Sequence, residues 1–293
     1  MKLFARIGGS RLPKSRQLLK QIGIYPIRDH YYQPLINDKL LRKSLREERN
    51  LPGINLKLLD QLKLLERLQY GQELIDLKLN ESAQADTEFC IRNPGFASGD
   101  AEFLYQIIRH KKPKKIIEIG SGQSTKIACL ATKKNSQENG NKATHLCIEP
   151  YEQPWLEKLN VQVARHLLEE LDISIFQELE AGDLLFIDSS HVIRPQGEVL
   201  MEYLEIIPLL KKGVIVHIHD IFTPRDYLDS WIREDVLLWN EQYLLECLLS
   251  NTSRYKILAS LNSLKHTHYE KLKLVCPYLS KNREPGSFYF EII

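Results

Sequence analysis

The sequence lacks the cysteine pattern of a disulfide-stabilised protein or a zinc ribbon. Its cysteines are odd in number, scattered and never spaced as Cys-x-x-Cys: Cys90, Cys129, Cys147, Cys247 and Cys276. This excludes a disulfide scaffold and a zinc site built from cysteines alone. The same usage is typical of a reducing compartment, so we expect a cytoplasmic protein.

Long hydrophobic runs and an excess of one charge are also missing. No apolar run approaches the roughly 18 residues of a membrane span, and the start, MKLFARIGGSRLPKSR, has no apolar core of a secretion signal. The 40 Lys and Arg residues nearly balance 38 Asp and Glu, leaving a net charge of +2. Because nucleic-acid binding needs a broad basic surface, we expect neither nucleic acid nor a membrane as a partner.

What the sequence does contain is typical of a globular protein with a sizeable core. It has 293 residues, 43% hydrophobic and 27% charged, without internal repeats or low-complexity tracts. A helical extension, residues 1–97, is predicted to precede a main domain, residues 98–293. The pattern Leu58, Leu62, Leu65 marks an apolar helical stripe in this extension.

The first 50 or so residues are polar and basic. One interpretation is a solvated arm that packs on the main domain, and the other is a lid or partner-binding arm. Loops rich in Tyr, His and Asp often cover sites, which makes His30 and Tyr31 candidate substrate contacts.

From residue 98 onward, apolar strands alternate with helices. This alternation predicts a doubly wound, mostly parallel α/β sheet covered on both faces. Strands are expected at 114–119, 145–149, 161–164, 183–188 and 214–220. A helix from Ser124 to Thr132 should give way to a polar loop over 133–142. A long helix over 231–250 and strands at 255–259 and 287–292 follow, and the two strands suggest an antiparallel edge pair.

A glycine turn follows the first of these strands. Gly120, Ser121 and Gly122 stand between a strand and a helix, the arrangement that phosphate and nucleotide sites use. Thr125 replaces the third glycine of the dinucleotide fingerprint, and no Walker phosphate loop occurs. Glu149, at the end of the next strand, is placed to accept two hydrogen bonds from a ribose diol, or else is a surface glutamate.

Acidic and histidine side chains gather after the fourth and fifth strands. Ligands of doubly wound sheets lie at the carboxyl ends of the strands, so these residues should share one rim. They are Asp188, Ser189, Ser190, His191, His217, His219 and Asp220. His217 lies deeper in its strand and is expected in the core. Just beyond this rim, Arg225 and Tyr227 are candidate substrate contacts.

Three interpretations of this rim stay open. Asp188, His219 and Asp220 could bind a divalent metal, with imidazole shifting the preference from Mg toward Mn, Fe or Zn. Alternatively, His191 or His219 is a general base oriented by a carboxylate such as Asp188. In the third interpretation the carboxylates cap loops and the histidines satisfy buried hydrogen bonds.

The motifs EIGSGQST, CIEP, LLFIDSSH and VIVHIHDIFTPRDY resemble a class I S-adenosylmethionine-dependent methyltransferase. They resemble in particular methyltransferase family 24, which is related to macrocin O-methyltransferase and cephalosporin-hydroxylase-like proteins. The resemblance covers about residues 98–293. It implies a seven-stranded Rossmann-like sheet whose last strand is antiparallel.

The resemblance also implies roles for individual residues. Glu118, Gly120 and Gly122 would border the methionine part of S-adenosylmethionine, Glu149 would bind its ribose, and Ser121 and Asp188 would complete the cofactor site. Metal-dependent relatives carry an acid after the fourth strand and an acidic pair after the fifth, of which His219 replaces the first member. No acidic residue is obvious for adenine, because Ala164 and Arg165 stand after the third strand.

The expected activity is O-methylation of a hydroxyl on a small molecule, sugar or other natural product, with or without a divalent metal. One alternative is a metal-dependent enzyme on the same scaffold that catalyses another reaction, such as oxidation, and the other is a non-catalytic binding module. The expected partner is therefore a small-molecule or glycan acceptor, and a homo-oligomer is compatible with this reading.

Overall fold

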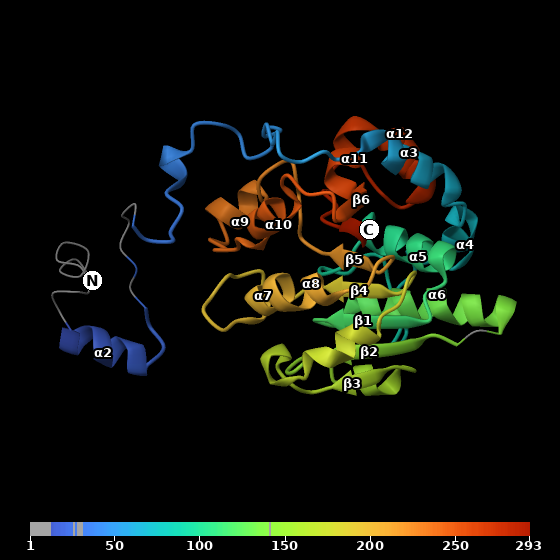
Figure 1. Cartoon of the computed structure of the whole chain (residues 1–293), viewed down its shortest axis with the longest axis horizontal. Coiled ribbons are helices and arrows are strands. Elements are labelled where there is room, and N and C mark those ends of the chain that lie inside the picture. Colours follow the sequence, from blue (N-terminus) through green and yellow to red (C-terminus); the bar gives the residue numbers. More distant parts are fainter. Residues whose placement is uncertain (1–12, 26, 28–31, 141) are drawn as a thin grey trace. The chain divides into compact units, whose positions relative to one another are not determined.

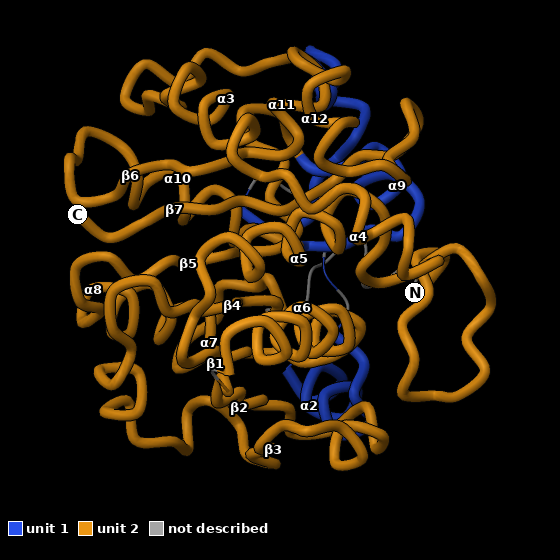
Figure 2. The backbone as a smooth tube through the Cα atoms, turned by 90° about the vertical axis from the view of Figure 1, so that its right-hand side faces the viewer, with its two compact units in different colours: residues 1–47, 227–238 blue, residues 48–226, 239–293 orange. Residues whose placement is uncertain are grey.

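A computed structural model describes residues 13–25, 27, 32–140 and 142–293. The chain forms two compact units, residues 1–47 with 227–238 and residues 48–226 with 239–293 (Figure 2). The described part of the first unit contains α2 (Pro13–Gln21), η2 (Asp38–Leu40) and α9 (Asp229–Arg233). His30 and Tyr31 lie outside the described residues. The boundary at residues 97 and 98 stays a prediction.

The second unit is built on a mostly parallel sheet. Its strands are β1 (Lys115–Ile119), β2 (Thr144–Ile148), β3 (Gln162–Ala164), β4 (Leu184–Ile187), β5 (Ile215–Ile218), β6 (Tyr255–Ser260) and β7 (Phe288–Ile292). In the part of the chain that the structure describes, they form one seven-stranded sheet in the order β3-β2-β1-β4-β5-β7-β6 (Figure 1). The first five are parallel, whereas β7 is antiparallel to β5 and β6. The predicted Rossmann-like fold is confirmed.

Alternating side chains of the strands supply two hydrophobic cores, one on each face of the sheet. Ile116 packs with α5 (Asp100–Lys111) and α6 (Gln123–Asn139). Ile117 and Ile119 pack instead with residues of α7 (Glu198–Met201), η6 (Glu202–Ile206), α8 (Ile207–Leu209) and α10 (Glu241–Leu249). Because both faces are covered, the parallel strands are apolar on both sides.

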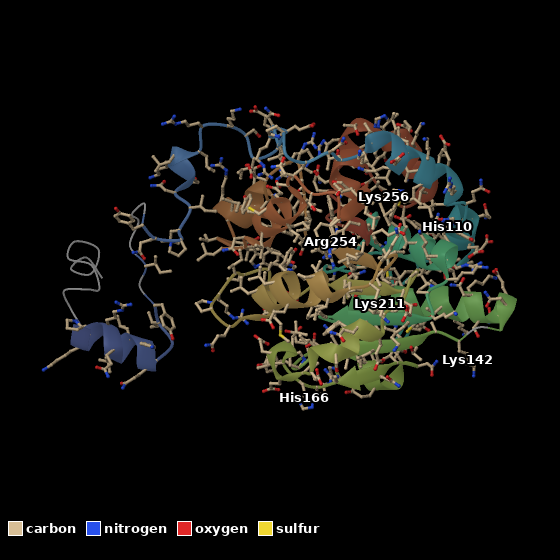
Figure 3. All side chains as sticks on the ribbon, in the orientation of Figure 1. His110, Lys142, His166, Lys211, Arg254 and Lys256 are labelled. Atoms are coloured by element: carbon tan, nitrogen blue, oxygen red, sulfur yellow. The ribbon has the colours of Figure 1, made fainter. Side chains whose placement is uncertain are left out.

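Further helices complete the second unit. They are α3 (Leu58–Arg67), α4 (Gly71–Asp76), η3 (Leu156–Lys158), η4 (Leu168–Glu170), η5 (Ile173–Glu178), α11 (Leu261–Thr267) and α12 (Tyr269–Val275). The helix predicted from the leucine stripe is confirmed as α3. Figure 3 labels basic side chains that come from separate elements and loops of this unit: His110, Lys142, His166, Lys211, Arg254 and Lys256.

Two predictions about helices were wrong. The loop expected over 133–142 is mostly helix, because α6 continues to Asn139 and ends only where Gly140 adopts a left-handed conformation at φ +73°. The helix expected over 231–250 is interrupted: α9 ends at Arg233, and α10 begins at Glu241. Val236 between them has φ +55°, which a continuous helix does not permit.

Among the described residues, no helix is long and apolar enough to cross a membrane. The cytoplasmic location stays a prediction.

Candidate functional site

A cavity of about 370 Å³ opens at the carboxyl ends of β1, β2 and β4. Gly120, Glu149 and Asp188 all contribute to its wall. The remaining lining residues are Ile119, Ile148, Pro150, Tyr151, Glu152, Leu167, Leu168, Glu169, Ser189, Ser190, Arg194 and Glu198. Its volume falls within the usual range of small-molecule sites, and its place at the strand ends is where doubly wound folds bind ligands.

The segment after β3 also lines this cavity, although the sequence offered no cofactor residue there. Leu167, Leu168 and Glu169 form part of the wall. Across from them, Arg194 lies 3.8 Å from Glu169, donates to Ser190 Oγ at 3.0 Å and pairs with Glu198. Of these contacts, the Arg194–Glu169 ion pair joins the segment after β3 to the loop after β4. Local sequence gives no signal for them, since each charged residue alone resembles a surface group.

Gly120 is required by the protein's own backbone. It has φ +75°, and a Cβ there would overlap the carbonyl oxygen of Asp188 and lie 2.8 Å from its carbonyl carbon. The group that approaches Gly120 is the carbonyl of Asp188 just after β4, and the expected place of this glycine beside a cofactor stays a prediction. Gly122 differs, because φ is −170° and a Cβ would meet nothing within 4 Å.

Gly120→Ala is therefore expected to destabilise the fold by about 3 kcal/mol or more, since it combines a left-handed backbone with a collision against backbone. Urea unfolding followed by circular dichroism measures this loss. The matched control is Gly122→Ala, which should change the free energy of unfolding by less than about 1 kcal/mol. Equal stability of the two variants would contradict this account of the turn.

Glu149 connects the end of β2 to the glycine turn. Its Oε1 accepts hydrogen bonds from the backbone amides of Tyr151 at 3.1 Å and Glu152 at 2.9 Å. Its Oε2 accepts one from the amide of Ser121 at 3.3 Å. These contacts hold the carboxylate in the cavity wall and leave about one of its four acceptor sites, on Oε2, available to a ligand hydroxyl.

Glu118 lies behind the turn, buried beneath the first turn of α6. Its Oε2 accepts a hydrogen bond from Thr125 Oγ1 at 2.6 Å and lies 3.0 Å from His145 Nε2. Its Oε1 is buried and has no hydrogen-bond partner among the described residues. A buried carboxylate oxygen without a partner is costly, which makes it a candidate contact for a ligand.

The structure brings together acidic and histidine side chains at the ends of β4 and β5, as predicted for the rim. His191 Nε2 lies 3.3 Å from Asp188 Oδ1 and 3.5 Å from Asp220 Oδ2. His219 Nδ1 lies 3.4 Å from Asp188 Oδ1 and 3.5 Å from Asp220 Oδ1. Two carboxylates and two imidazoles thus meet at one point. Asp188, His191 and Asp220 bring potential ligand atoms within 4.8 Å of one another.

His191 is held from behind by a glutamate that the sequence did not indicate. Its Nδ1 lies 2.7 Å from Glu241 Oε2, and Glu241 Oε1 accepts a hydrogen bond from Tyr203 at 2.9 Å. The His191 ring lies 4.3 Å from the ring of Trp239, centroid to centroid. His191 has φ +61°, and its carbonyl accepts hydrogen bonds from the amides of Asn240 and Glu241.

This arrangement determines which nitrogen faces the rim. With Nδ1 directed at Glu241, Nε2 is left for Asp188 and Asp220, and an imidazole so held keeps one orientation. Of the three interpretations, simple loop capping accounts least well for two carboxylates converging on the same imidazole.

Mutual attraction explains the titration of the rim. Burial alone would lower the pKa of His191, but Asp188, Glu241 and Asp220 raise it well above its usual value. Burial likewise opposes the charge on His219, yet Asp220, Asp188 and Asp100 raise its pKa well above normal. Burial would raise the pKa of Asp188, but the two histidines hold it below its usual range.

The second carboxylate behaves differently. Burial raises the pKa of Asp220 despite the attraction of His219 and His191. Taken together, the protons retained on the two imidazoles compensate the negative charge of the rim carboxylates. A divalent cation would supply the same positive charge.

Asp100, the first residue of α5, also belongs to this group and was missed. It is fully buried, and its Oδ2 lies 3.8 Å from His219 Nε2. Its Oδ1 accepts hydrogen bonds from the amides of Gly286 and Ser287, each at 2.9 Å. Asp100 thus ties His219 to the segment that precedes β7.

His217 lies in the core. It is buried, and its ring stacks on that of Tyr289 with centroids 4.0 Å apart and meets Phe186 edge-on. Burial lowers the pKa of His217 well below normal, so the ring is neutral. It is the partner of aromatic rings rather than of the rim carboxylates.

The two residues predicted as substrate contacts after β5 lie outside the cavity lining. Arg225 is buried, with Nη2 3.6 Å from Glu48 Oε2, and its carbonyl accepts a hydrogen bond from Gln242 Nε2 at 2.8 Å. Tyr227 belongs to the first unit, where its ring centroid lies 6.4 Å from that of Trp231. Their roles toward a substrate stay predictions.

Residues 117–221 match a protein family described as a methyltransferase domain. A protein of Archaeoglobus fulgidus, described as uncharacterized, is 29% identical over 162 residues, which are 52% of this chain and 72% of that protein. A crystal structure of the O-methyltransferase from Bacillus cereus in complex with SAH has a TM-score of 0.39 and 12% identity, covering 79% of this chain and 91% of the other.

The family match runs from β1 through β5. It therefore includes the glycine turn, Glu149 and the rim of Asp188, His191, His219 and Asp220. Residues 117–221 match the methyltransferase-domain family, and the resemblance of this chain to class I S-adenosylmethionine-dependent methyltransferases is confirmed.

Proposed function

We propose that the protein transfers a methyl group from S-adenosylmethionine to a hydroxyl of a small-molecule or glycan acceptor, with a divalent cation at the rim. One observation carries this proposal. A cavity lined by Gly120, Glu149 and Asp188 lies directly beside the convergent side chains of Asp188, His191 and Asp220. Asp188 belongs to both, so donor and acceptor sites would adjoin at this residue.

The residues of the cavity fit the cofactor. Glu149 in the cavity wall would offer its carboxylate to the ribose diol. Glu118 lies behind the glycine turn rather than in the lining, and its buried Oε1 has no partner among the described residues. S-adenosylmethionine supplies an electrophilic methyl group on a sulfonium. The protein's task is to hold the acceptor oxygen in line with that methyl, because positioning accounts for most of the catalysis of such a transfer.

The rim fits a divalent cation by the chemistry of its donors. Two carboxylates with one or two imidazoles suit Mn²⁺, Fe²⁺ or Zn²⁺ better than Mg²⁺. We propose Asp188, His191 and Asp220 as ligands, with His219 adjoining them. In this set His191 takes the place of His219, which was the histidine ligand expected from the sequence. A bound cation of this kind lowers the pKa of a coordinated hydroxyl.

The chain's own residues would prepare the acceptor. Glu241 holds Nδ1 of His191, which directs Nε2 at the rim, while Asp100 Oδ2 lies 3.8 Å from the far nitrogen of His219. Trp239 covers one face of the His191 ring. Asp220 would accept the proton released from the hydroxyl, because burial raises the pKa of this carboxyl, whereas the pKa of Asp188 is held below its usual range.

Calorimetry with S-adenosylmethionine and S-adenosylhomocysteine tests the cofactor assignment. Gly122→Val should weaken binding by about tenfold or more, since it places a branched side chain in the open space of the turn. Its melting temperature should stay near that of the wild type, because no atom lies within 4 Å of the added Cβ.

The control is a variant on the opposite side of the sheet, Leu249→Val in α10, which should bind both ligands normally. Wild-type protein that binds neither ligand would refute the cofactor assignment. Binding without methyl transfer, together with oxygen-dependent turnover of an iron-loaded protein, would favour an oxidation reaction instead.

A further inference from the structure

A buried histidine outside the cavity is linked to the glycine turn by three consecutive contacts. His145 lies on β2, diagonally across from Glu118 on β1, and both side chains face α6. His145 Nε2 lies 3.0 Å from Glu118 Oε2, which in turn accepts the hydrogen bond of Thr125 Oγ1 at 2.6 Å. Thr125 Oγ1 accepts a hydrogen bond from the amide of Gly122 at 3.2 Å.

The residues of this chain of contacts are buried. Only 1% of Glu118, none of Thr125 and 5% of His145 is exposed. A buried carboxylate is stable only when it is paired and hydrogen-bonded, and His145 is the cationic partner that this one has. Although burial opposes the charge, Glu118 and the nearby thiols of Cys129 and Cys147 raise the pKa of His145 well above its usual value.

The contacts all engage the same carboxylate oxygen. Because Oε2 is shared by His145 and Thr125, the other oxygen, Oε1, stays without a partner among the described residues. His145 thereby fixes the rotamer of Glu118, which presents Oε1 and anchors the amide of Gly122 through Thr125.

We propose that His145 is a positioning residue that holds the glycine turn in its binding-competent form through Glu118 and Thr125. The proposal rests on the proposed function for its link to cofactor binding. Its direct consequence, an ordered turn, does not depend on any ligand.

Two substitutions of His145 separate the effect of its hydrogen bond to Glu118 from the effect of its volume. His145→Gln keeps a side-chain N–H that can reach Glu118, whereas His145→Leu removes the donor and leaves the carboxylate unpaired. Ile116→Ala is the matched control, because Ile116 pairs with His145 across the strands, is fully buried and touches none of the three contacts. It loosens the same layer without changing the hydrogen bonds.

Hydrogen–deuterium exchange of the ligand-free protein gives the first measurement. In His145→Leu, amide exchange across residues 119–125 should be faster by about tenfold or more, the usual consequence of leaving a buried charged group unpaired. His145→Gln should stay within about threefold of the wild type. Ile116→Ala should lower global stability without selectively exposing this segment.

Affinity for S-adenosylhomocysteine gives the second measurement, and it should weaken by about tenfold in His145→Leu and recover in His145→Gln. Unchanged exchange and affinity in a folded His145→Leu would overturn the proposal. A second outcome would also overturn the proposal. If the Asp188→Asn variant, whose rim site is disabled, still binds one zinc ion per chain, then Glu118, His145 and Cys147 are metal ligands instead. If the wild type binds no cofactor, the exchange result still decides the role of His145.

Discussion

His191→Gln is expected to lower methyl transfer by about 100-fold or more, the usual scale for loss of a group that acts on the transferred proton or its oxygen. The reason is the position of Nε2, 3.3 Å from Asp188 and 3.5 Å from Asp220. A glutamine amide can still bond Glu241 but cannot serve as an imidazole ligand. Single-turnover kinetics with saturating cofactor and acceptor would measure the change.

Binding of S-adenosylhomocysteine should survive this substitution, since His191 is absent from the cavity lining. Glu241→Gln is the informative companion, because it leaves His191 in place but removes the charge that orients it. Its loss should be smaller, about tenfold to 100-fold, as is usual when the group behind a metal-binding histidine is altered. Near-normal turnover in His191→Gln would mean that the ring only closes the loop, and His219 would become the principal histidine.

Asp188→Asn is expected to abolish divalent-cation binding, with affinity falling by at least about 100-fold, because it removes a charged ligand and leaves the imidazoles facing one carboxylate fewer. Elemental analysis and calorimetry with Mn²⁺ and Zn²⁺ would measure this directly. The backbone carbonyl of Asp188, which packs against Gly120, is unchanged in the variant, so the turn should stay intact.

Asp183→Asn is the matched control for this experiment. Asp183 precedes the same strand at its opposite end, where it accepts hydrogen bonds from the amides of Lys114 and Lys115. It should retain the cation. A wild-type protein that is fully active after chelation would contradict metal assistance and leave acid–base chemistry by the rim side chains.

The sheet was predictable because each strand is a short apolar run whose partners follow from alternation with helices. The positions of Asp188 and Asp220 were also predictable, since residues that follow parallel strands lie at the same edge of the sheet. The partners of these residues were not. Glu241 and Asp100 reach the rim from far away in the chain, and no local pattern distinguishes them from ordinary surface acids.

The errors have a similar origin. The helix expected through Trp239 is broken because the amides of Asn240 and Glu241 bond the carbonyl of His191, a contact that periodicity cannot reveal. The approach of the Asp188 carbonyl to Gly120 was also not predictable, because sequence shows which residue is flexible but not which group lies against it. The role of Gly120 toward a ligand stays a prediction.

The position of β7 bears on how the chain is made. The strand nearest the end of the described chain lies inside the sheet, between β5 and β6, and Gly286 and Ser287 just before it hold Asp100. While residues 286–292 are still in the ribosomal tunnel, β5 has an open edge, His217 lacks Tyr289 and Asp100 lacks its amide partners. The rim therefore cannot mature before β7 has left the tunnel, and ribosome-tethered chains should bind cofactor and metal only once a linker carries β7 clear of it.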